Sequence, residues 1–583
     1  MHTTSPFRLS RRTPFGLGEN LAEWATGLSQ LDQYYAQRPT NCDTPTFLRF
    51  TLEILGIDYQ IVKGSLESIP TSGPTVVVAN HPLGCVEGVI LAELLLQQRS
   101  DIKIFANQYL KAVPELDELF IGVDVFESSE ARSANLKALR QAHTHLGQGG
   151  VLLLFPAGEV SQLIDSKSQR IEDKEWSRSV SSLIKKAKAT TIPIFINGQN
   201  SRSFYLAGKI HPLLRTLMLG RELLNKANDP VKLSIGSPVK MVEIATLSDS
   251  QIVSYLRLNT YLLNPRKSLP AKDACSSKPL PIADPLPLAD MLTDLHSLPK
   301  KDKLLSSGPF DVFCTRSESI PSILHEIGRL REINFRHVGE GTGLELDIDQ
   351  FDQSYYHLFI WDNDEQCLVG AYRLGLVDEL IEKGDINSLY SRTLFHYDRP
   401  FIESMGKSIE MGRSVIDQRY QKSMGALLLL WKGIATFVSH NPDYTHLFGP
   451  VSISNDYSQQ ARLLLAETMT LHHYDQDKAE HVSPLNPLPK EPSLWNTSML
   501  AALGDMQLLS RLLARIDDGK GVPVLLRQYL ALSGKLIAFN VDPKFNNALD
   551  GLIVVDLRQV QPKTLSRYMG MNQAQQYLDY HQD

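Results

Sequence analysis

The sequence predicts two successive α/β domains, and three observations support this fold class. In each half, short apolar runs bounded by Gly, Pro or Asn are separated by longer helical stretches, as expected for buried strands connected by helices. A segment with eight prolines, 265–309, separates the halves, and proline at that density disfavours helices and central strands. The 583 residues, 43% hydrophobic and 21% charged, are typical of a folded chain of several domains.

The apolar runs fix the elements that we expect, taken in chain order. The first half is predicted to form strand, helix, strand, helix, strand and strand at Thr75–Ala79, Gly88–Gln97, Ile102–Ala106, Ala131–Leu146, Val151–Phe155 and Thr191–Ile196. The second half is predicted to form a hairpin, a further strand and a long apolar helix at Tyr355–Trp361, Cys367–Leu374, Lys407–Ile416 and Met424–Val438.

These patterns predict four parts of the chain. They are an N-terminal helical and basic arm, an α/β domain, a proline-rich linker and a second α/β domain, at 1–50, 51–264, 265–309 and 310–583. Each α/β part is large enough to bury a core of its own.

Composition excludes several classes of partner. A formal net charge of -6 provides no basic field for a nucleic acid, and five scattered cysteines without CxxC spacing give no reason to expect a metal site. The apolar runs are far shorter than a bilayer span. We therefore expect a cytoplasmic protein that is soluble or peripheral to a membrane; Arg8, Arg11 and Arg12 of the arm suit weak attraction to an anionic leaflet.

His81 and Glu87 form the first pair with a chemical interpretation. His81 follows the predicted strand 75–79, and Pro82 is suited to open the helix that carries Glu87. At a strand end an imidazole can face a cleft, take a proton from a hydroxyl and be oriented by a nearby carboxylate. A helix-capping His beside a solvated Glu fits the spacing equally well, so the pattern alone leaves both interpretations open.

This half resembles the glycerolipid acyltransferases related to lysophosphatidic acid acyltransferases. Their motif N-H-x4-D is similar to Asn80-His81 followed, one residue later than usual, by Glu87. Their motif F-P-E-G-T-R-S is similar to Phe-Pro-Ala-Gly-Glu-Val-Ser at 155–161. The resemblance implies that His81 is the general base for a lipid hydroxyl and that Glu87 is its partner. It also implies a substrate-binding turn made of Phe155, Gly158, Glu159 and Ser161.

Two features of this half qualify the resemblance. Val160 stands where the family has an Arg suited to an acceptor phosphate, which favours a phosphate-free acceptor. Glu159 stays open as an alternative base. We expect Trp176, Asn200 and Ser201 to be packing and turn residues.

The second half offers Glu410 and Arg413 on a predicted strand, followed by a turn that opens the helix from Met424. Backbone N–H groups at such a helix start suit the phosphates of coenzyme A or of a phosphopantetheine arm. The turn resembles the Q/R-x-x-G-x-G/A loop of the acetyltransferase (GNAT) fold, although Met424 replaces the first glycine. An ordinary strand-to-helix connection remains the alternative. The resemblance implies that the donor is held by four residues: Gln421, Lys422, Gly425 and Ala426.

Glu410 and Arg413 are also similar to the E-x-S/T-R element of acyl-homoserine-lactone synthases. Further short matches, at 331–343 and 448–455, resemble the hemolysin-like branch that includes ornithine N-acyltransferases. This implies that Glu410 accepts or relays the amine proton and that Arg413 holds a substrate carboxylate; a structural ion pair is the alternative. Residues three apart on a strand face opposite ways, so both can meet one substrate only across a β-bulge, which Gly412 would permit.

Together the halves resemble the bifunctional ornithine-lipid acyltransferases. The resemblance implies N-acylation of ornithine with a 3-hydroxyacyl chain by the C-terminal half, then O-acylation of the lyso-lipid hydroxyl by the N-terminal half. The donor would be acyl-acyl carrier protein or acyl-coenzyme A, with no permanently bound cofactor. Glycine or another amino acid in place of ornithine, and a catalytically decayed, membrane-associated hemolysin-like binding protein, remain as alternatives.

Overall fold

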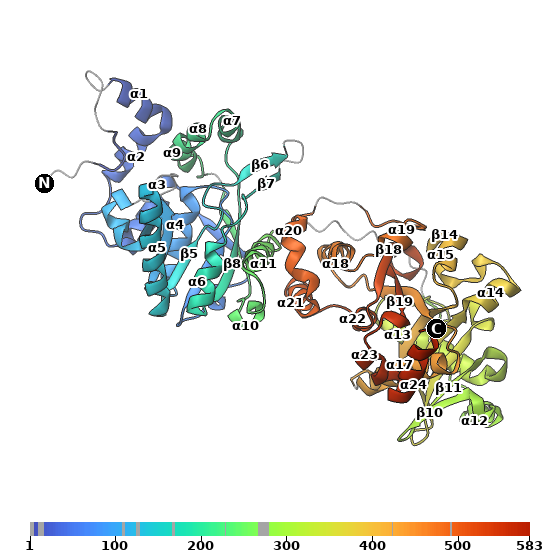
Figure 1. The fold of residues 1–583 in the computed structure, drawn as a ribbon. Coiled ribbons are helices and arrows are strands. Elements are labelled where there is room, and N and C mark those ends of the chain that lie inside the picture. The colour runs from blue at the N-terminus through green and yellow to red at the C-terminus, as the bar shows by residue number, and fades with distance from the viewer. Residues whose placement is uncertain are drawn as a thin grey trace. The chain divides into compact units, whose positions relative to one another are not determined.

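The computed structural model describes residues 5–9, 17–107, 111–123, 129–165, 170–227, 229–265, 279–422, 424–489 and 493–582. The chain divides into two compact units (Figure 1), the first holding Met1–Lys267 and Ser493–Leu508, the second Ser268–Pro492 and Leu509–Asp583. Both contain a sheet with packed helices, which confirms the predicted α/β class. No helix in the described ranges combines the length and the hydropathy that a bilayer crossing needs. Of the basic arm, Arg8 pairs with Asp32, whereas positions 11 and 12 lie outside the described residues.

A seven-stranded sheet forms the centre of the first unit, in the order β1-β9-β8-β2-β5-β3-β4. Its strands are β1 (Tyr59–Lys63), β2 (Thr75–Ala79), β3 (Ile102–Asn107), β4 (Phe120–Val123), β5 (Val151–Leu154), β8 (Thr190–Asn197) and β9 (Val231–Ile235). Neighbouring strands pair parallel, except the antiparallel β8 and β9. All four strands predicted from the apolar runs are present, with ends that differ by at most one residue.

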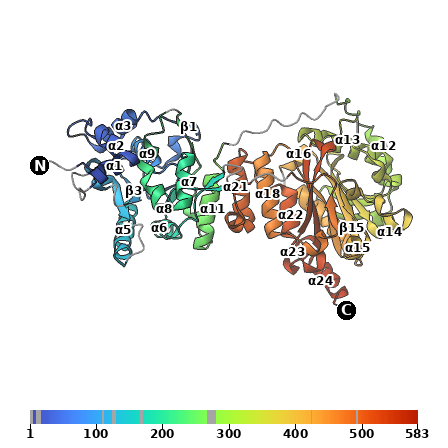
Figure 2. The same cartoon turned by 90° about the horizontal axis from the view of Figure 1, so that it is seen from above.

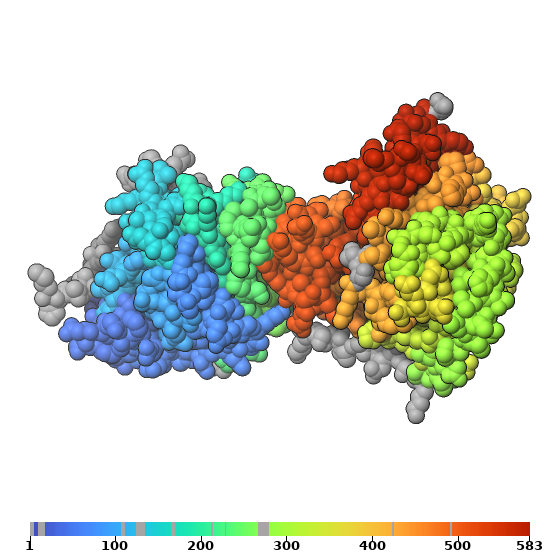
Figure 3. All heavy atoms as spheres, turned by 90° about the horizontal axis from the view of Figure 1, so that it is seen from below, coloured from blue at the N-terminus to red at the C-terminus, as the bar shows by residue number. Residues whose placement is uncertain are grey.

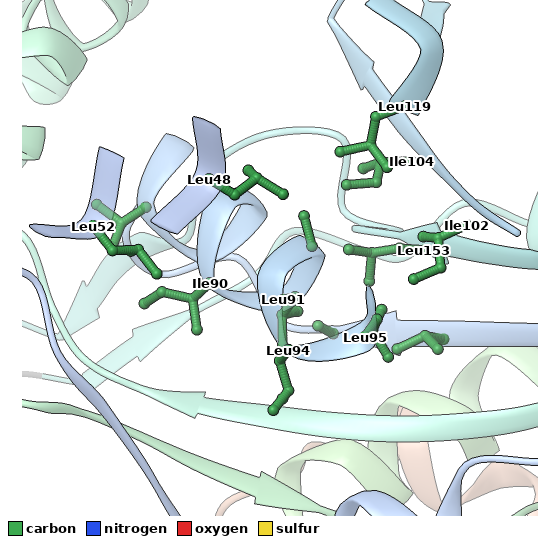
Figure 4. Packing of buried hydrophobic residues seen from close by; sticks show 14 of the residues in the cluster. Leu48, Leu52, Ile90, Leu91, Leu94, Leu95, Ile102, Ile104, Leu119 and Leu153 are labelled. Atoms are coloured by element: carbon green, nitrogen blue, oxygen red, sulfur yellow. The ribbon is translucent and has the colours of Figure 1, made fainter. Parts of the chain in front are cut away.

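Helices cover both faces of this sheet. α3 (Thr44–Leu55) and α4 (Cys85–Leu96) contribute to one core with Val77 of β2 and Leu153 of β5, part of which Figure 4 shows. Val76 and Val78 point to the opposite face because side chains alternate along a strand, and both are buried too. α5 (Ser129–Gly147), α6 (Ser179–Ala187) and α11 (Asp249–Tyr261) pack there, against β5, β8 and one another.

Smaller elements complete the first unit. They are α1 (Leu17–Thr26), α2 (Leu28–Tyr35), the hairpin of β6 (Gln162–Asp165) and β7 (Arg170–Glu172), α7 (Arg202–Ile210), α8 (Pro212–Leu217), α9 (Leu219–Leu223) and α10 (Met241–Ile244).

A segment from late in the chain also belongs to this unit. α20 (Thr497–Leu500) and the short 3-10 turn 501–504 pack against α11. Trp495, Met499 and Leu503 of this segment are buried. We predicted that residues 493–508 belong to the C-terminal domain, because no local pattern marks them as part of the core of the first unit.

An eight-stranded sheet forms the second unit, in the order β10-β11-β12-β13-β15-β16-β19-β18. Its strands are β10 (Lys303–Ser307), β11 (Phe310–Arg316), β12 (Tyr356–Asp362), β13 (Cys367–Leu376), β15 (Ser408–Ile416), β16 (His446–Ile453), β18 (Lys535–Asp542) and β19 (Ala548–Asp556). Neighbours pair antiparallel except β15 with β16, which are parallel. The predicted hairpin is β12 with β13.

Two long helices pack on opposite faces of the second sheet. α13 (Pro321–His337) shares a core with Phe313 and Phe359, and α12 (Leu288–Ser297) lies beside it (Figure 2). On the other face, Gly433 of α17 (Met424–His440) lies close to Val312 and Leu358. The C-terminal helices α23 (Pro562–Met569) and α24 (Met571–Tyr580) pack against α17, and Figure 3 shows them in red at the surface of the unit.

The remaining helices and strands of the second unit are short or peripheral. They are α14 (Val377–Lys383), β14 (Phe395–Tyr397), α15 (Arg399–Glu403), α16 (Gln418–Gln421), α18 (Gln459–His472), α19 (Gln476–Ala479), β17 (Val482–Pro484), α22 (Val524–Ala531) and α21 (Met506–Ile516), whose first three residues fall in the first unit.

The proline-dense segment is more structured than its composition predicts. α12 and β10 both lie inside 265–309, the range expected to be a linker. Pro287 directly precedes α12 and Pro299 follows it, so these prolines flank the helix where no backbone N–H is missed. β10 is an edge strand and ends before Pro309. Proline therefore marks the ends of elements here instead of excluding them.

Candidate active sites

The strand order of the first unit brings the two predicted motifs together. β2 and β5 are parallel neighbours, with Val78 opposite Leu154, so the residues after each strand meet at the same edge of the sheet. His81 follows β2 and Phe155 follows β5. Their rings stack with centroids 4.4 Å apart and planes inclined by 28°.

His81 and Glu87 form the pair that the sequence predicted. His81 Nδ1 lies 2.8 Å from Glu87 Oε1, and the Glu87 side chain is fully buried whereas that of His81 is 18% exposed. α4 begins at Cys85 and not at Pro82, because Gly84 has a φ of 92° and the chain turns before the helix starts. This loop absorbs the extra residue of the motif and lets Glu87, in the first turn, reach the imidazole. Glu87 Oε1 also accepts the Leu83 N–H at 2.9 Å.

Asp173 holds this site together and was not singled out by the sequence. Its Oδ1 accepts the backbone N–H of His81 at 3.1 Å and the hydroxyl of Ser161, and its Oδ2 accepts the indole N–H of Trp176 at 2.9 Å. Burial raises the pKa of the Asp173 carboxyl above its ordinary value, although these hydrogen bonds oppose the shift. Trp176 is buried, and its indole N–H is used on Asp173.

Two predicted substrate contacts have structural partners instead. The hydroxyl of Ser161 is buried and donates to Asp173, and the Ser161 backbone N–H donates to the His81 carbonyl at 2.8 Å. Ser161 therefore fixes the loop and does not face an acceptor. Glu159 pairs with Lys174 and Arg215. Burial opposes ionisation of Glu159, but these cations outweigh it and hold its pKa below the ordinary value. Glu159 is therefore poorly suited to be the alternative base.

Phe155 and Gly158 keep positions consistent with a substrate contact. The Gly158 N–H donates to the Phe155 carbonyl at 3.0 Å and closes a tight turn. Gly158 has a φ of 70°, and among the described residues other than its chain neighbours no atom lies within 4 Å of the place where a Cβ would stand. The turn is thus open on that side, next to the ring that stacks on His81.

In the second unit, a β-bulge and a splayed strand pair create a cavity. Arg413 has a φ of 51°, and the register between β13 and β15 shifts there by one residue. β15 and β16 pair only through 408–410 and 446–448. Beyond these pairs, both strands line a cavity of about 160 Å³.

Glu410 lies outside this cavity. Its carboxylate is 1% exposed and accepts four hydrogen bonds: the hydroxyls of Tyr355 and Ser391 and the backbone N–H groups of Tyr390, at 2.9 Å, and Ser391, at 2.8 Å. Glu410 is not among the residues that line the cavity. The structure thus gives it the role of anchoring the 390–391 turn, and a direct contact with an amine is not available to it.

Arg413 lines the cavity but already has protein partners. Its Nε lies 3.2 Å from Asp347 Oδ2, its Nη2 lies 3.4 Å from Asp349 Oδ2, and its Nη1 donates to the Tyr390 hydroxyl at 3.1 Å. The bulge that the sequence required is present, yet Glu410 and Arg413 do not converge on one space. Binding of a substrate carboxylate by Arg413 stays a prediction.

The predicted donor-binding turn precedes α17. Gln421 Nε2 donates to Asn334 Oδ1 at 2.9 Å and to the Ile416 carbonyl at 2.8 Å, which ties the turn to α13 and β15. Lys422 and Gly425 are exposed, whereas Ala426 is buried. Their role in holding a phosphopantetheine arm stays a prediction.

Comparison with known proteins finds a different family model in each half of the chain. A family model described as an acyltransferase matches residues 32–271, and one described as an acetyltransferase (GNAT) domain matches 330–432. A glycine N(alpha)-acyltransferase of Bacteroides thetaiotaomicron is 27% identical over 289 residues, 47% of this chain and 83% of that protein. One of Phocaeicola vulgatus is 28% identical over 244 residues, 39% of this chain and 74% of that protein.

A second kind of relative has a different named activity. A lyso-glycine lipid O-acyltransferase of Phocaeicola vulgatus is 26% identical over 200 residues, which cover 33% of this chain and 68% of that protein. The chain is an enzyme of the acyltransferase class, with an acyltransferase domain followed by a GNAT-like domain.

Proposed function

We propose that the two units act in succession on one aminolipid. The C-terminal unit transfers a 3-hydroxyacyl chain to the amine of an amino acid, and the N-terminal unit then acylates the hydroxyl of that chain. The observation that best supports two acylations is the buried His81–Glu87 pair, 2.8 Å apart, in a chain whose GNAT-like unit also carries a cavity. One site suits a hydroxyl acceptor and the other an amine.

The O-acyl step follows from the geometry of the imidazole. With Nδ1 protonated and donating to Glu87, the Nε2 of His81 has a lone pair available for the proton of a hydroxyl. The hydroxyl oxygen attacks the thioester carbonyl carbon, the carbon–sulfur bond breaks, and the proton leaves with the thiolate. Glu87 stabilises the imidazolium that forms, and Phe155 limits how the ring can turn.

The acceptor of this step is proposed to lack a phosphate. Val160, at the position where related enzymes have an Arg, is buried in an apolar cluster with Phe204 and Tyr205. The nearby Arg215 donates to Glu159 through its Nη2 and is held by that carboxylate. A lyso-aminolipid with a bare hydroxyl fits this environment.

For the amino acid, two candidates have separate support. Ornithine is the acceptor that the sequence resemblance implies, and glycine is the acceptor named for the similar N-acyltransferases. The proposed acyl donor is acyl-acyl carrier protein or acyl-coenzyme A, and both products are amphiphiles expected at the cytoplasmic surface of the inner membrane.

The test expresses the full chain and follows lipids by mass spectrometry, with glycine and ornithine supplied in turn. His81→Ala should lower the O-acylation rate by about 10²- to 10⁴-fold, and the N-acylated lyso-lipid should accumulate. The exposed His211, also in the first unit, provides the matched control His211→Ala. Undiminished diacylated lipid in His81→Ala cells would remove His81 from the mechanism, and no amide product from the wild type would support a decayed binding protein.

A further inference from the structure

The cavity between β15 and β16 is lined by three carboxylates, one that follows α13 and two from the paired strands β18 and β19. Glu340 follows α13, Asp542 ends β18 and Asp550 lies in β19. Strand pairing places Asp550 opposite Ser452 of β16 and Asn540 of β18. None of the three was predicted as a site residue, because no local motif contains them.

Asp550 differs from the other buried acids of the unit. It is 6% exposed, and within the described part of the chain its carboxylate makes neither a hydrogen bond nor an ion pair. By contrast, Asp542 accepts the Lys544 N–H at 2.9 Å, and Glu410 accepts four donors. An unpaired buried carboxylate is costly, so its presence at a cavity wall points to a cationic ligand.

The two nearby cations do not satisfy Asp550. Arg413 is engaged by Asp347 and Asp349, and the guanidinium of Arg462 donates to Asn455 Oδ1 and to the Asn547 carbonyl. The cavity therefore keeps an excess of negative charge.

The groups that face Asp550 also favour a proton acceptor. Burial, with Asp542 and Glu340, raises its pKa well above the ordinary value, while Arg413 and Arg462 lower it. A carboxylate in this environment is a stronger base than one in water.

We infer that this acidic cavity binds the ammonium group of the amino-acid acceptor and that Asp550 takes its proton. The inference deepens the proposed N-acylation and rests on it. The ammonium gives one proton to Asp550, and the neutral nitrogen attacks the thioester carbonyl carbon. The carbon–sulfur bond breaks, and the thiolate takes a second proton from nitrogen, which leaves an amide and a thiol. Glu340 and Asp542 hold the ammonium, in the place where Glu410 was predicted to act.

The experiment measures N-acylation of glycine and of ornithine by the full chain, with a 3-hydroxyacyl thioester as donor. Asp550→Asn should lower kcat by about 10²- to 10⁴-fold, and its residual rate should rise about tenfold per pH unit while the amine is still mostly protonated. Asp364→Asn, an exposed carboxylate in the β12–β13 turn, is the matched control and should keep the wild-type rate.

The outcomes separate this inference from the proposed function. A wild type that acylates neither amino acid refutes both. A wild type that is active beside an Asp550→Asn variant within about threefold of it refutes only the inference. Should Asp550→Asn fail to fold, the partly exposed Glu340 decides the question: Glu340→Gln should raise the KM for the amino acid severalfold, and an unchanged KM overturns the ammonium site.

Discussion

Glu410→Gln is expected to destabilise the second unit, because the carboxylate accepts four donors at once. Oε1 accepts the N–H and hydroxyl of Ser391, and Oε2 accepts the Tyr390 N–H and the Tyr355 hydroxyl. An amide has one oxygen, so whichever way it turns, its NH2 group meets one backbone N–H. A hydroxyl can reorient, but a backbone N–H cannot.

The cost follows from counting these groups. The amide costs least when its NH2 group faces the Tyr390 N–H, because that N–H keeps the Tyr355 hydroxyl as an acceptor at 2.9 Å. The lost hydrogen bond then costs about 1 kcal/mol, and two remaining hydrogen bonds change from charged to neutral at about 1 kcal/mol each. A neutral amide is easier to bury than a carboxylate and recovers part of this. We therefore expect a loss of about 1–3 kcal/mol in the free energy of unfolding, at roughly 2–4 °C in Tm per kcal/mol for a unit of this size.

Scanning calorimetry of the full chain checks this value, with Glu365→Gln at an exposed position of the β12–β13 turn as the control. Thermal transitions of Glu410→Gln that match the wild type, together with N-acylation that falls and recovers at higher pH, would refute the structural role. Glu410 would then handle the amine proton, as its sequence motif implies.

Two further predictions concern stability. Trp495→Ala should lower the unfolding free energy of the first unit by about 3–5 kcal/mol, because this side chain is only 2% exposed and lies in the segment that packs on α11. The control Trp24→Ala removes a side chain of α1 that is 74% exposed and should change little. Equal Tm values for both variants would contradict the assignment of 493–508 to this unit. The raised pKa of Asp550 means that the wild type loses stability as pH rises from about 4 through that pKa. Asp550→Asn should therefore have a higher Tm than the wild type at neutral pH and the same Tm in acid. Parallel Tm profiles of the two proteins across pH would disprove the shift.

Much of the first site was predictable because it is local in sequence. A β-branched run fixes β2, and six positions separate His81 from its partner, so residue order alone brings the two within one loop and one helical turn. The apolar run 151–154 then places Phe155 at the same sheet edge, since adjacent parallel strands end together. Asp173 could not be found in this way, because it reaches the loop from the segment after the β6–β7 hairpin and has no motif of its own.

In the second site, the hydrogen bonds of the structure distinguish two acids that the sequence pattern alone did not separate correctly. Glu410 and Asp550 are both acids on strands of the same sheet, and both are almost fully buried. Motif resemblance selected Glu410, which the fold surrounds with four protein donors, whereas Asp550 has none among the described residues and borders the cavity. A carboxylate whose acceptor sites are filled by the protein has little room left for a hydrogen bond from a substrate. An unpaired carboxylate at a cavity wall is destabilised as an anion until it gains a cation or a proton. When the ammonium group of the amino acid binds beside it, such a carboxylate is therefore driven to accept the proton.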